Sequence, residues 1–343
     1  MEIELDPPLS TGNITDPWKK ELYERLDRMR KKCGVVCTIN DKETYDKYAI
    51  RNEPEPRYDE SSTVSDSTTS APDRFQVPID CDSIFEMDEI DASDLTFPYP
   101  VPEELLPFYT LNGMIPVDHR ARWKSEYLNS TSNSLVWTKD YIEQSLASLK
   151  NGTFEGTYGK SVSNEIRDYI SSKMDLVGKS VLVVGSELPW VEVCALAAGA
   201  SKVTTLEYAE IHSTHPQIQT MNPKEFRTYN LQNNKNTARE QYDVILSFSS
   251  LEHSGLGRYG DALNPWGDIL SLARVWCVTK PKGQLMLGLP VAKDYIRFNA
   301  HRGYGNIRWP LITNNWIPLD GVVDFEKGRE SGGGTTHLFE KVS

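Results

Sequence analysis

Residues 180–207, which read SVLVVGSELPWVEVCALAAGASKVTTLE, decide the fold class of this chain. The run Val181–Val184 is continuously β-branched or aliphatic, as expected of a parallel strand that is buried on both faces. Gly185 ends this strand, and Pro189 can begin a helix at the position where its missing N–H costs least. A second strand then ends on an acid, Glu207. A strand, a glycine turn, a helix and a second strand ending in an acid form the first half of a nucleotide-binding α/β unit.

The loop after the first strand favours S-adenosylmethionine over a dinucleotide. A dinucleotide-binding dehydrogenase uses G-x-G-x-x-G, so that a pyrophosphate can approach the helix N-terminus. This loop has one glycine, Gly185, and an acid, Glu187. An acid repels a pyrophosphate but favours the cationic sulfonium and ammonium groups of S-adenosylmethionine. Glu207 lies about 20 residues beyond the glycine, where an acid binds ribose hydroxyls. We therefore expect S-adenosylmethionine as cofactor, and a dehydrogenase is a distant alternative.

The remaining elements continue the alternation of strands and helices. They are predicted as strands at 242–248 and 284–290, helices at 138–149, 163–173 and 268–278, and a hairpin-like pair at 316–324 and 337–342. Alternation followed by a reversed last strand is typical of a mostly parallel α/β sheet. The sequence thus predicts a Rossmann-like class I methyltransferase sheet of seven strands, mostly parallel with the last strand antiparallel, over residues 138–343.

Residues 249–261, SSLEHSGLGRYGD, resemble the EHxGLGRYGD signature of an uncharacterised methyltransferase-like family. This family of domains of unknown function was first defined on nematode proteins, and the similarity extends over about residues 180–337. Residues 298–302 and the turn at 185–192 resemble the same family. The resemblance implies a fold of the class I methyltransferase superfamily. It also implies that Glu207 binds ribose and that Gly185, Ser249 and Ser250 line the cofactor site.

Glu252 and His253 are the catalytic candidates. They follow the strand predicted at 242–248, at the carboxyl edge of the sheet where ligands bind in such folds. Methyl transfer requires positioning and a dry site, and it requires a base only if the nucleophile begins protonated. Histidine has a suitable pKa for that role, and Glu252 can orient or replace it. In the alternative interpretation, His253 caps a turn and Glu252 pairs with Arg258.

Substrate contacts are predicted from the glycine-rich loop and from the segment after the next strand. The glycines at 255, 257 and 260 indicate a backbone bent tightly around a ligand, although a structural Ω-loop needs the same residues. An arginine here can hold a carboxylate or phosphate, or it can pair with a nearby acid. The predicted substrate-binding residues are Arg258, Tyr259, Asp261, Asn299, His301 and Arg302.

Histidine and cysteine spacing predicts no metal site. His212 and His215 have ligand-like spacing, but a zinc site needs three or four ligands and no further one stands close. The five cysteines are odd in number and scattered, which is typical of reduced thiols. The acidic N-terminus lacks the apolar core of a secretory signal, and no run approaches the ~20 apolar residues of a membrane span. We therefore expect a cytoplasmic or nuclear protein without membrane contact.

The first 137 residues are expected to lie mostly outside the core. Residues 1–52 are predicted as an N-terminal extension with one amphipathic helix, which Asp16 caps and Pro17 begins. Residues 53–95 are predicted to be a disordered acidic linker, and residues 96–137 an irregular proline-rich lead-in. The linker interleaves acids with Phe85 and Met87, so the alternative is a short motif for a basic protein partner.

The formal net charge of −12 argues against nucleic-acid binding, because nucleic-acid footprints are basic. The leading hypothesis is an S-adenosylmethionine-dependent methyltransferase that acts on a small-molecule or glycan-like acceptor. The alternative is a non-catalytic methyltransferase-like protein that serves as a binding or scaffold module, which the degenerate first loop favours.

Overall fold

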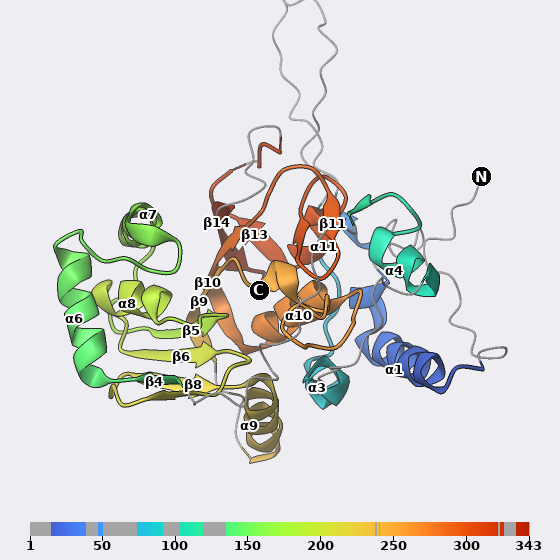
Figure 1. Cartoon of the computed structure of the whole chain (residues 1–343), viewed down its shortest axis with the longest axis horizontal. Helices are drawn as coiled ribbons and strands as arrows, with labels where there is room; N and C mark the ends of the chain where they lie inside the picture. The colour runs from blue at the N-terminus through green and yellow to red at the C-terminus, as the bar shows by residue number, and fades with distance from the viewer. Residues whose placement is uncertain are drawn as a thin grey trace, which may run out of the picture.

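The computed structural model describes residues 15–38, 47–50, 74–91, 103–118, 135–236, 239, 241–321, 323–325 and 334–342. A seven-stranded sheet, in the order β13-β14-β10-β9-β5-β6-β8, forms its centre (Figure 1). Its strands are β5 (Ser180–Val184), β6 (Lys202–Leu206), β8 (Ile218–Met221), β9 (Tyr242–Phe248), β10 (Thr279–Leu289), β13 (Trp316–Pro318) and β14 (Thr335–Lys341). The strands from β8 to β10 pair in parallel, whereas β14 is antiparallel to both β10 and β13. The mixed α/β architecture expected from the sequence is confirmed.

The chain changes direction across the sheet between β5 and β9. Counted in chain order from β5, the strands lie in the spatial order 3-2-1-4-5-7-6, so the second and third strands lie on one side of β5 and the later strands on the other. Loops leaving β5 and β9 therefore depart in opposite directions and leave a crevice at the carboxyl ends of these two strands. Gly185 and Ser249 are the first residues beyond them.

Helices cover both faces of the sheet. Along β5, Val181 and Val183 pack with α6 (Lys139–Lys150), α7 (Gly159–Lys173) and α8 (Trp190–Ala197). Leu182 and Val184 point to the other face, toward α9 (Pro223–Asn236) and α10 (Gly267–Val278). Figure 1 shows α6, α7 and α8 on one side of the sheet and α10 on the other. Neighbouring residues of β5 point to opposite faces because side chains alternate along a strand with a period of two residues.

The first helix, α1 (Pro17–Cys33), forms where the sequence predicts it and packs on the main core. The Asp16 carboxylate accepts a hydrogen bond from the Trp18 N–H at 3.0 Å, and Gly34 ends the helix with a φ of 57°. Leu22, Leu26 and Met29 lie at helical spacing and are buried in the same core as α10. The N-terminal extension therefore contributes to the core that supports the sheet.

Residues 74–91 correct one expectation, because they are ordered and not a disordered linker. They form β2 (Arg74–Phe75), α3 (Cys81–Glu86) and a 3-10 turn, Asp88–Asp91, and Phe85 and Met87 are fully buried. The acids of this segment bind arginines of the same chain: Asp91 pairs with Arg227 at 2.7 Å and with Arg274 at 2.5 Å. Arg227 and Arg274 thus neutralise an acid of the segment for which the sequence offered a basic protein partner as the alternative. The rest of the predicted linker lies outside the described residues.

Two disulfides correct the expectation of reduced thiols. Cys33 bonds Cys37, and Cys81 of α3 bonds Cys277 of α10 across 196 positions of sequence, while Cys194 is free and buried. Because disulfides persist mainly in oxidising compartments, cysteine usage no longer supports a cytoplasmic location.

Short elements complete the described chain. They are β1 (Ala49–Ile50) paired with β2; β3 (Val117–Asp118), β11 (Tyr295–Arg297) and β12 (His301–Gly303) in a three-stranded sheet; β4 (Leu135–Trp137) paired with β7 (Ile211–Ser213); α4 (Leu106–Thr110); and α11 (Trp309–Ile312). Within the described ranges, no helix has the length and hydrophobicity needed to cross a membrane.

Candidate functional site

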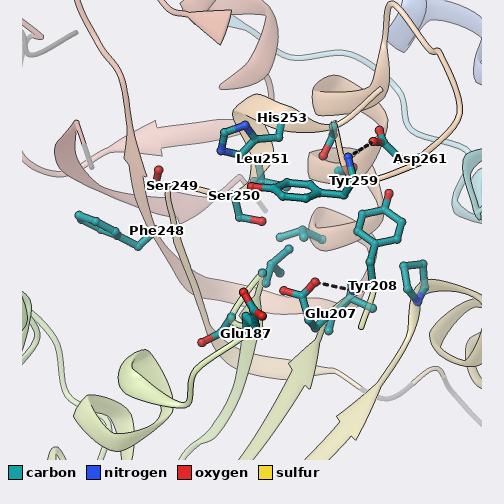
Figure 2. A pocket seen from close by; sticks show the side chains of 18 of the residues that line it. Glu187, Glu207, Tyr208, Phe248, Ser249, Ser250, Leu251, His253, Tyr259 and Asp261 are labelled. Carbon is teal, nitrogen blue, oxygen red and sulfur yellow. Dashed lines mark hydrogen bonds between the residues drawn. The ribbon is translucent and has the colours of Figure 1, made fainter. Parts of the chain in front are cut away.

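A pocket of about 180 Å³ opens over the carboxyl ends of β5, β6 and β9. It therefore lies at the crevice where the strand order reverses, which is where open α/β sheets bind ligands. Figure 2 shows the pocket with the Tyr259 ring on one side and the carboxylates of Glu187 and Glu207 on the other. All five residues predicted to bind cofactor line it: Gly185, Glu187, Glu207, Ser249 and Ser250.

Gly185 is required by the close approach of the two strand ends. Its φ is +78°, and a Cβ at this position would lie 1.7 Å from the Ser250 Oγ. Its N–H donates to the Leu206 carbonyl at 2.9 Å, which fixes the turn against the end of β6. The head of β5 therefore packs directly against Ser250, and both residues line the pocket.

Glu207 presents a carboxylate to the pocket directly after β6. Its Oε1 accepts a hydrogen bond from the Tyr208 N–H at 2.7 Å, which orients the side chain. Burial raises the pKa of Glu207 above its ordinary value, against the opposing effect of backbone N–H donors. Glu187, the second acid on this side, is exposed at the rim.

A third acid, Glu192 of α8, braces the loop from behind. Its two carboxyl oxygens contact the Ser186 Oγ at 2.9 Å and the Thr205 Oγ1 at 2.7 Å. The Ser186 hydroxyl also contacts the Leu188 carbonyl at 2.6 Å, and it has only one proton to donate. If that proton goes to the carbonyl, then Glu192 must itself donate a proton to Ser186. Complete burial, which raises the pKa of Glu192 to about 7, agrees with this proton position.

Three aromatic rings form the apolar wall of the pocket. Tyr158, Trp190 and Phe248 pack in edge-to-face pairs with ring centroids 5.2–6.0 Å apart. The sequence predicts Trp190 only as a core aromatic, and it is indeed buried, but its ring also faces the cavity. Tyr158 was missed because it precedes α7, far from the strand ends on which the prediction relied.

The predicted catalytic pair lies on the β9 side of the pocket, in the turn Leu251–His253. The His253 Nδ1 contacts the Ala300 carbonyl, which can only accept, so Nδ1 carries the proton and Nε2 is bare in the neutral ring. His253 Nε2 lies 3.6 Å from the Glu252 Oε1. Glu252 is only 1% exposed; its Oε1 accepts from the Ser249 Oγ at 2.7 Å. The Glu252 Oε2 is buried and has no hydrogen-bond partner among the described residues.

Of the six predicted substrate-binding residues, Tyr259 and Asp261 reach the pocket. The Tyr259 ring packs edge-to-face on the His253 ring, with centroids 5.4 Å apart. Asp261 mainly braces its own loop, because its carboxylate accepts from the Gly255 N–H at 2.6 Å and from the Tyr259 N–H at 3.3 Å.

The other four predicted substrate residues lie outside the pocket lining. Arg302 is fully buried and donates to the Ser254 carbonyl at 2.5 Å, and Asn299 donates to the Gly257 carbonyl at 2.9 Å. The donors of these two residues hold the backbone of the glycine-rich loop, and neither residue lines the pocket. Arg258 donates to the Asn299 carbonyl at 3.2 Å, and the His301 Nε2 lies 3.0 Å from the Tyr295 hydroxyl.

The pocket carries an excess of negative charge. Among the described residues that line it, Arg274 of α10 is the only lysine or arginine. Its guanidinium donates to the Asp91 carboxylate and to the Met87 carbonyl, each at 2.5 Å. Sequence reasoning missed Arg274 because both partners come from the segment taken as a disordered linker. With its arginine engaged, the pocket has no evident site for a phosphate.

His212 and His215 do not form a metal site with other described side chains. His215 is buried, and its Nε2 lies 3.5 Å from the Glu143 carboxylate, whereas His212 is exposed on β7. Among the described residues no group of three metal-ligating side chains was found.

Residues 178–324 match the model of a family described as a Caenorhabditis protein of unknown function, DUF268. This match agrees with the nematode-defined family that residues 249–261 resemble. No curated protein matches the chain.

The solved structures that this chain matches include three bacterial proteins. One, from Listeria monocytogenes and described as an S-adenosylmethionine-dependent methyltransferase, is 14% identical over 53% of this chain and 100% of that chain, with a TM-score of 0.34. The N-methyltransferase NodS from Bradyrhizobium japonicum WM9 is 12% identical over 54% and 97%, with a TM-score of 0.35. A protein from Lactococcus lactis described as a hemolysin is 14% identical over 37% of this chain, with a TM-score of 0.28. The alignment spans only 56% of the length of that protein.

Proposed function

We propose that this protein is an S-adenosylmethionine-dependent methyltransferase that acts on a small-molecule or glycan-like acceptor. The observation that carries the proposal is the charge and place of the pocket. It lies at the reversal of strand order, and acids follow both β5 and β6, while its one arginine is bound to Asp91.

The residues at the head of β5 and β6 fit this cofactor. Glu207 follows β6, where an acid binds the ribose diol in nucleotide-binding α/β folds. Gly185, with a φ of +78°, lets Ser250 pack against the head of β5, and both residues line the pocket. Glu187 and Glu207 offer negative charge to a cation, and the same charge opposes a pyrophosphate. This combination favours S-adenosylmethionine over NAD.

The aromatic wall and the sheet order support the same assignment. When bound, S-adenosylmethionine supplies an electrophilic methyl group on a sulfonium. The faces of Tyr158, Trp190 and Phe248 attract a cation and exclude water from it. The antiparallel strand β14, inserted between β10 and β13, distinguishes this sheet from the dinucleotide-binding order 3-2-1-4-5-6. This order supports the class I methyltransferase sheet expected from the sequence.

The proposal is tested by calorimetric titration of the full chain with S-adenosylmethionine, S-adenosylhomocysteine and NAD. We expect saturable binding of the first two ligands at one site and none of NAD. Binding of NAD without either adenosyl ligand would overturn the assignment and favour a dehydrogenase. Binding of neither class would favour the non-catalytic scaffold.

A further inference from the structure

We propose that the β9 side of the pocket binds a neutral, hydroxyl-bearing acceptor, such as a sugar or a phenol, with His253 as the base that removes the hydroxyl proton. The inference rests on the proposed function and specifies its acceptor. It is carried by the tautomer of His253, the unpartnered oxygen of Glu252 and the charge of the pocket.

The surroundings of His253 fix which nitrogen can accept a proton. A backbone carbonyl cannot donate, so the contact between Nδ1 and the Ala300 carbonyl places the ring proton on Nδ1. The opposite nitrogen, Nε2, then carries a lone pair, and His253 lines the pocket. The ring is held by Tyr259 on one side and by His301, with a centroid distance of 6.2 Å, on another. Such an imidazole is suited to accept a proton from a ligand hydroxyl.

Glu252 is placed to stabilise the product of that transfer. Its Oε1 is 3.6 Å from the His253 Nε2, and its second oxygen is buried without a hydrogen-bond partner among the described residues. A buried carboxylate oxygen without a hydrogen-bond donor raises the free energy of the folded chain. A positive charge or a donor placed beside the Glu252 carboxylate therefore stabilises it. The protonated His253 ring supplies that charge. Glu252 is therefore a positioning residue that acts through His253.

The charge of the pocket selects among acceptors. Carboxylate and phosphate acceptors would be repelled by Glu187 and Glu207, and Arg274 is already bound to Asp91. An ammonium would be attracted, but the same acids would hold it in its protonated, unreactive form. A neutral hydroxyl suffers neither effect, and it is the nucleophile that needs a base. The rings of Tyr158 and Tyr259 offer apolar faces on which a sugar or phenol ring can pack.

The transfer step balances with these groups alone. The acceptor oxygen forms a bond to the methyl carbon as the carbon–sulfur bond breaks, and the electron pair of that bond stays on sulfur. The hydroxyl proton moves to the His253 Nε2. The resulting imidazolium lies beside the Glu252 carboxylate until it releases its proton to solvent.

The experiment measures S-adenosylhomocysteine formation by the full chain with five simple acceptor probes at millimolar concentration. These are methyl α-glucoside, catechol, benzoate, glucose 6-phosphate and phenethylamine. We expect turnover with at least one of the first two and none with the last three. His253→Ala should lower that turnover by about 10²–10⁴-fold while S-adenosylhomocysteine affinity stays within about twofold. His212→Ala, on the exposed edge of β7, is the matched control and should retain full turnover.

Glu252→Gln separates a positioning role from a purely structural one. We expect the acid limb of the pH–rate profile to move to lower pH in this variant, because the imidazolium loses its neighbouring carboxylate. Turnover with benzoate, glucose 6-phosphate or phenethylamine but with neither hydroxyl probe would overturn the acceptor class, as would no turnover in a chain that binds S-adenosylmethionine. Unchanged turnover in His253→Ala would contradict the assignment of His253 as the base. Failure to bind S-adenosylmethionine would instead contradict the proposed function.

Discussion

The loops that follow β5 and β9 meet at one pocket, but their glycines serve different purposes. At Gly185 the missing Cβ makes room for the Ser250 side chain, which itself lines the pocket. At Gly255, where φ is +77°, a Cβ would lie 2.1 Å from the Asn264 carbonyl oxygen, so this glycine permits loop packing. The comparison teaches that glycine content alone does not identify a ligand-binding loop. The partners of the backbone decide between the two purposes.

The β9 loop is thus a braced structure that presents two side chains. Arg302, Asn299 and Asp261 satisfy its carbonyl and N–H groups from behind. His253 and Tyr259 are the members that face the ligand space. The first prediction below tests this division between bracing groups and pocket-facing groups, and the others test the segments and acids around the same pocket.

The largest expected effect is on stability, from the bracing arginine. Arg302→Leu removes donors to the Ser254 and Asn264 carbonyls and a charge 3.7 Å from Asp268. We expect the free energy of unfolding to fall by roughly 3–5 kcal/mol, because it breaks a fully buried charged network. Chemical denaturation measures this loss. Arg258→Leu is the matched control, since Arg258 is only partly buried, and it should cost less than about 1 kcal/mol. Equal losses in the two variants would refute the division.

The second largest expected effect on stability comes from the disulfide between α3 and α10. Cys277 lies one turn beyond Arg274, so the bond holds the 81–91 segment beside the pocket wall. Cys81→Ser should lower the free energy of unfolding by roughly 2–5 kcal/mol, because the bond closes a long loop. Cys33→Ser should cost less, since that bond spans a sequence separation of only 4. Denaturation under non-reducing conditions compares them, and a larger effect for Cys33→Ser would contradict the account.

On the β5–β6 side the expected effect is on affinity. Glu207→Gln should weaken S-adenosylmethionine binding by about 1–3 kcal/mol, roughly 5–150-fold, through loss of a charged hydrogen bond. Gln keeps an oxygen that can accept from the backbone N–H groups around the side chain, such as that of Tyr208, so unfolding should change less than affinity. Glu210→Gln, exposed three residues later, is the control for charge. Calorimetry measures both, and equal affinities in both variants would remove Glu207 from the site.

A further expected effect is a pH dependence from Glu192. Burial raises its pKa to about 7 in the folded chain, from an ordinary value of 4.5. Between these values the folded state binds more protons than the unfolded state, so the free energy of unfolding falls as pH rises through about 4.5–7. Glu192→Gln should remove this decline in the free energy of unfolding, while the pH dependence that comes from other titrating groups should remain. A pH series of denaturation midpoints for both chains would show it, and parallel curves would mean that Glu192 is ionised in both states.

The sequence predicts those parts of the structure that are determined by residues close together in the chain. Buried parallel strands require continuous apolar runs, and the two at Val181–Val184 and Tyr242–Phe248 were placed within one residue of their observed bounds. Residues directly after these strands, such as Gly185 and Ser249, follow from the strand ends alone. The short strand β8 was not predicted, because its sequence, IQTM, places two polar residues between two apolar ones and gives no long apolar run.

The remaining parts depend on partners far away in sequence. Asp91 is ordered by Arg227 and Arg274, more than 130 positions later, so local composition indicated disorder. Arg302 was taken as a substrate ligand because its buried carbonyl partners cannot be seen in the sequence. Tyr158 precedes α7, on the face of the sheet that α6, α7 and α8 cover. Its contact with Trp190 holds its ring at the pocket, and that contact cannot be seen in the sequence.

The most direct test of the central claim compares two glycines by titration with S-adenosylhomocysteine. Gly185 and Gly178 both have positive φ, 78° and 72°, so alanine strains the backbone similarly at each. A Cβ at Gly178 meets nothing within 4 Å, whereas at Gly185 it meets Ser250 inside the pocket. If the head of β5 holds the cofactor, Gly185→Ala abolishes measurable binding while Gly178→Ala binds within about twofold of the unaltered chain. Equal binding by both variants would contradict a cofactor site at this edge of the sheet.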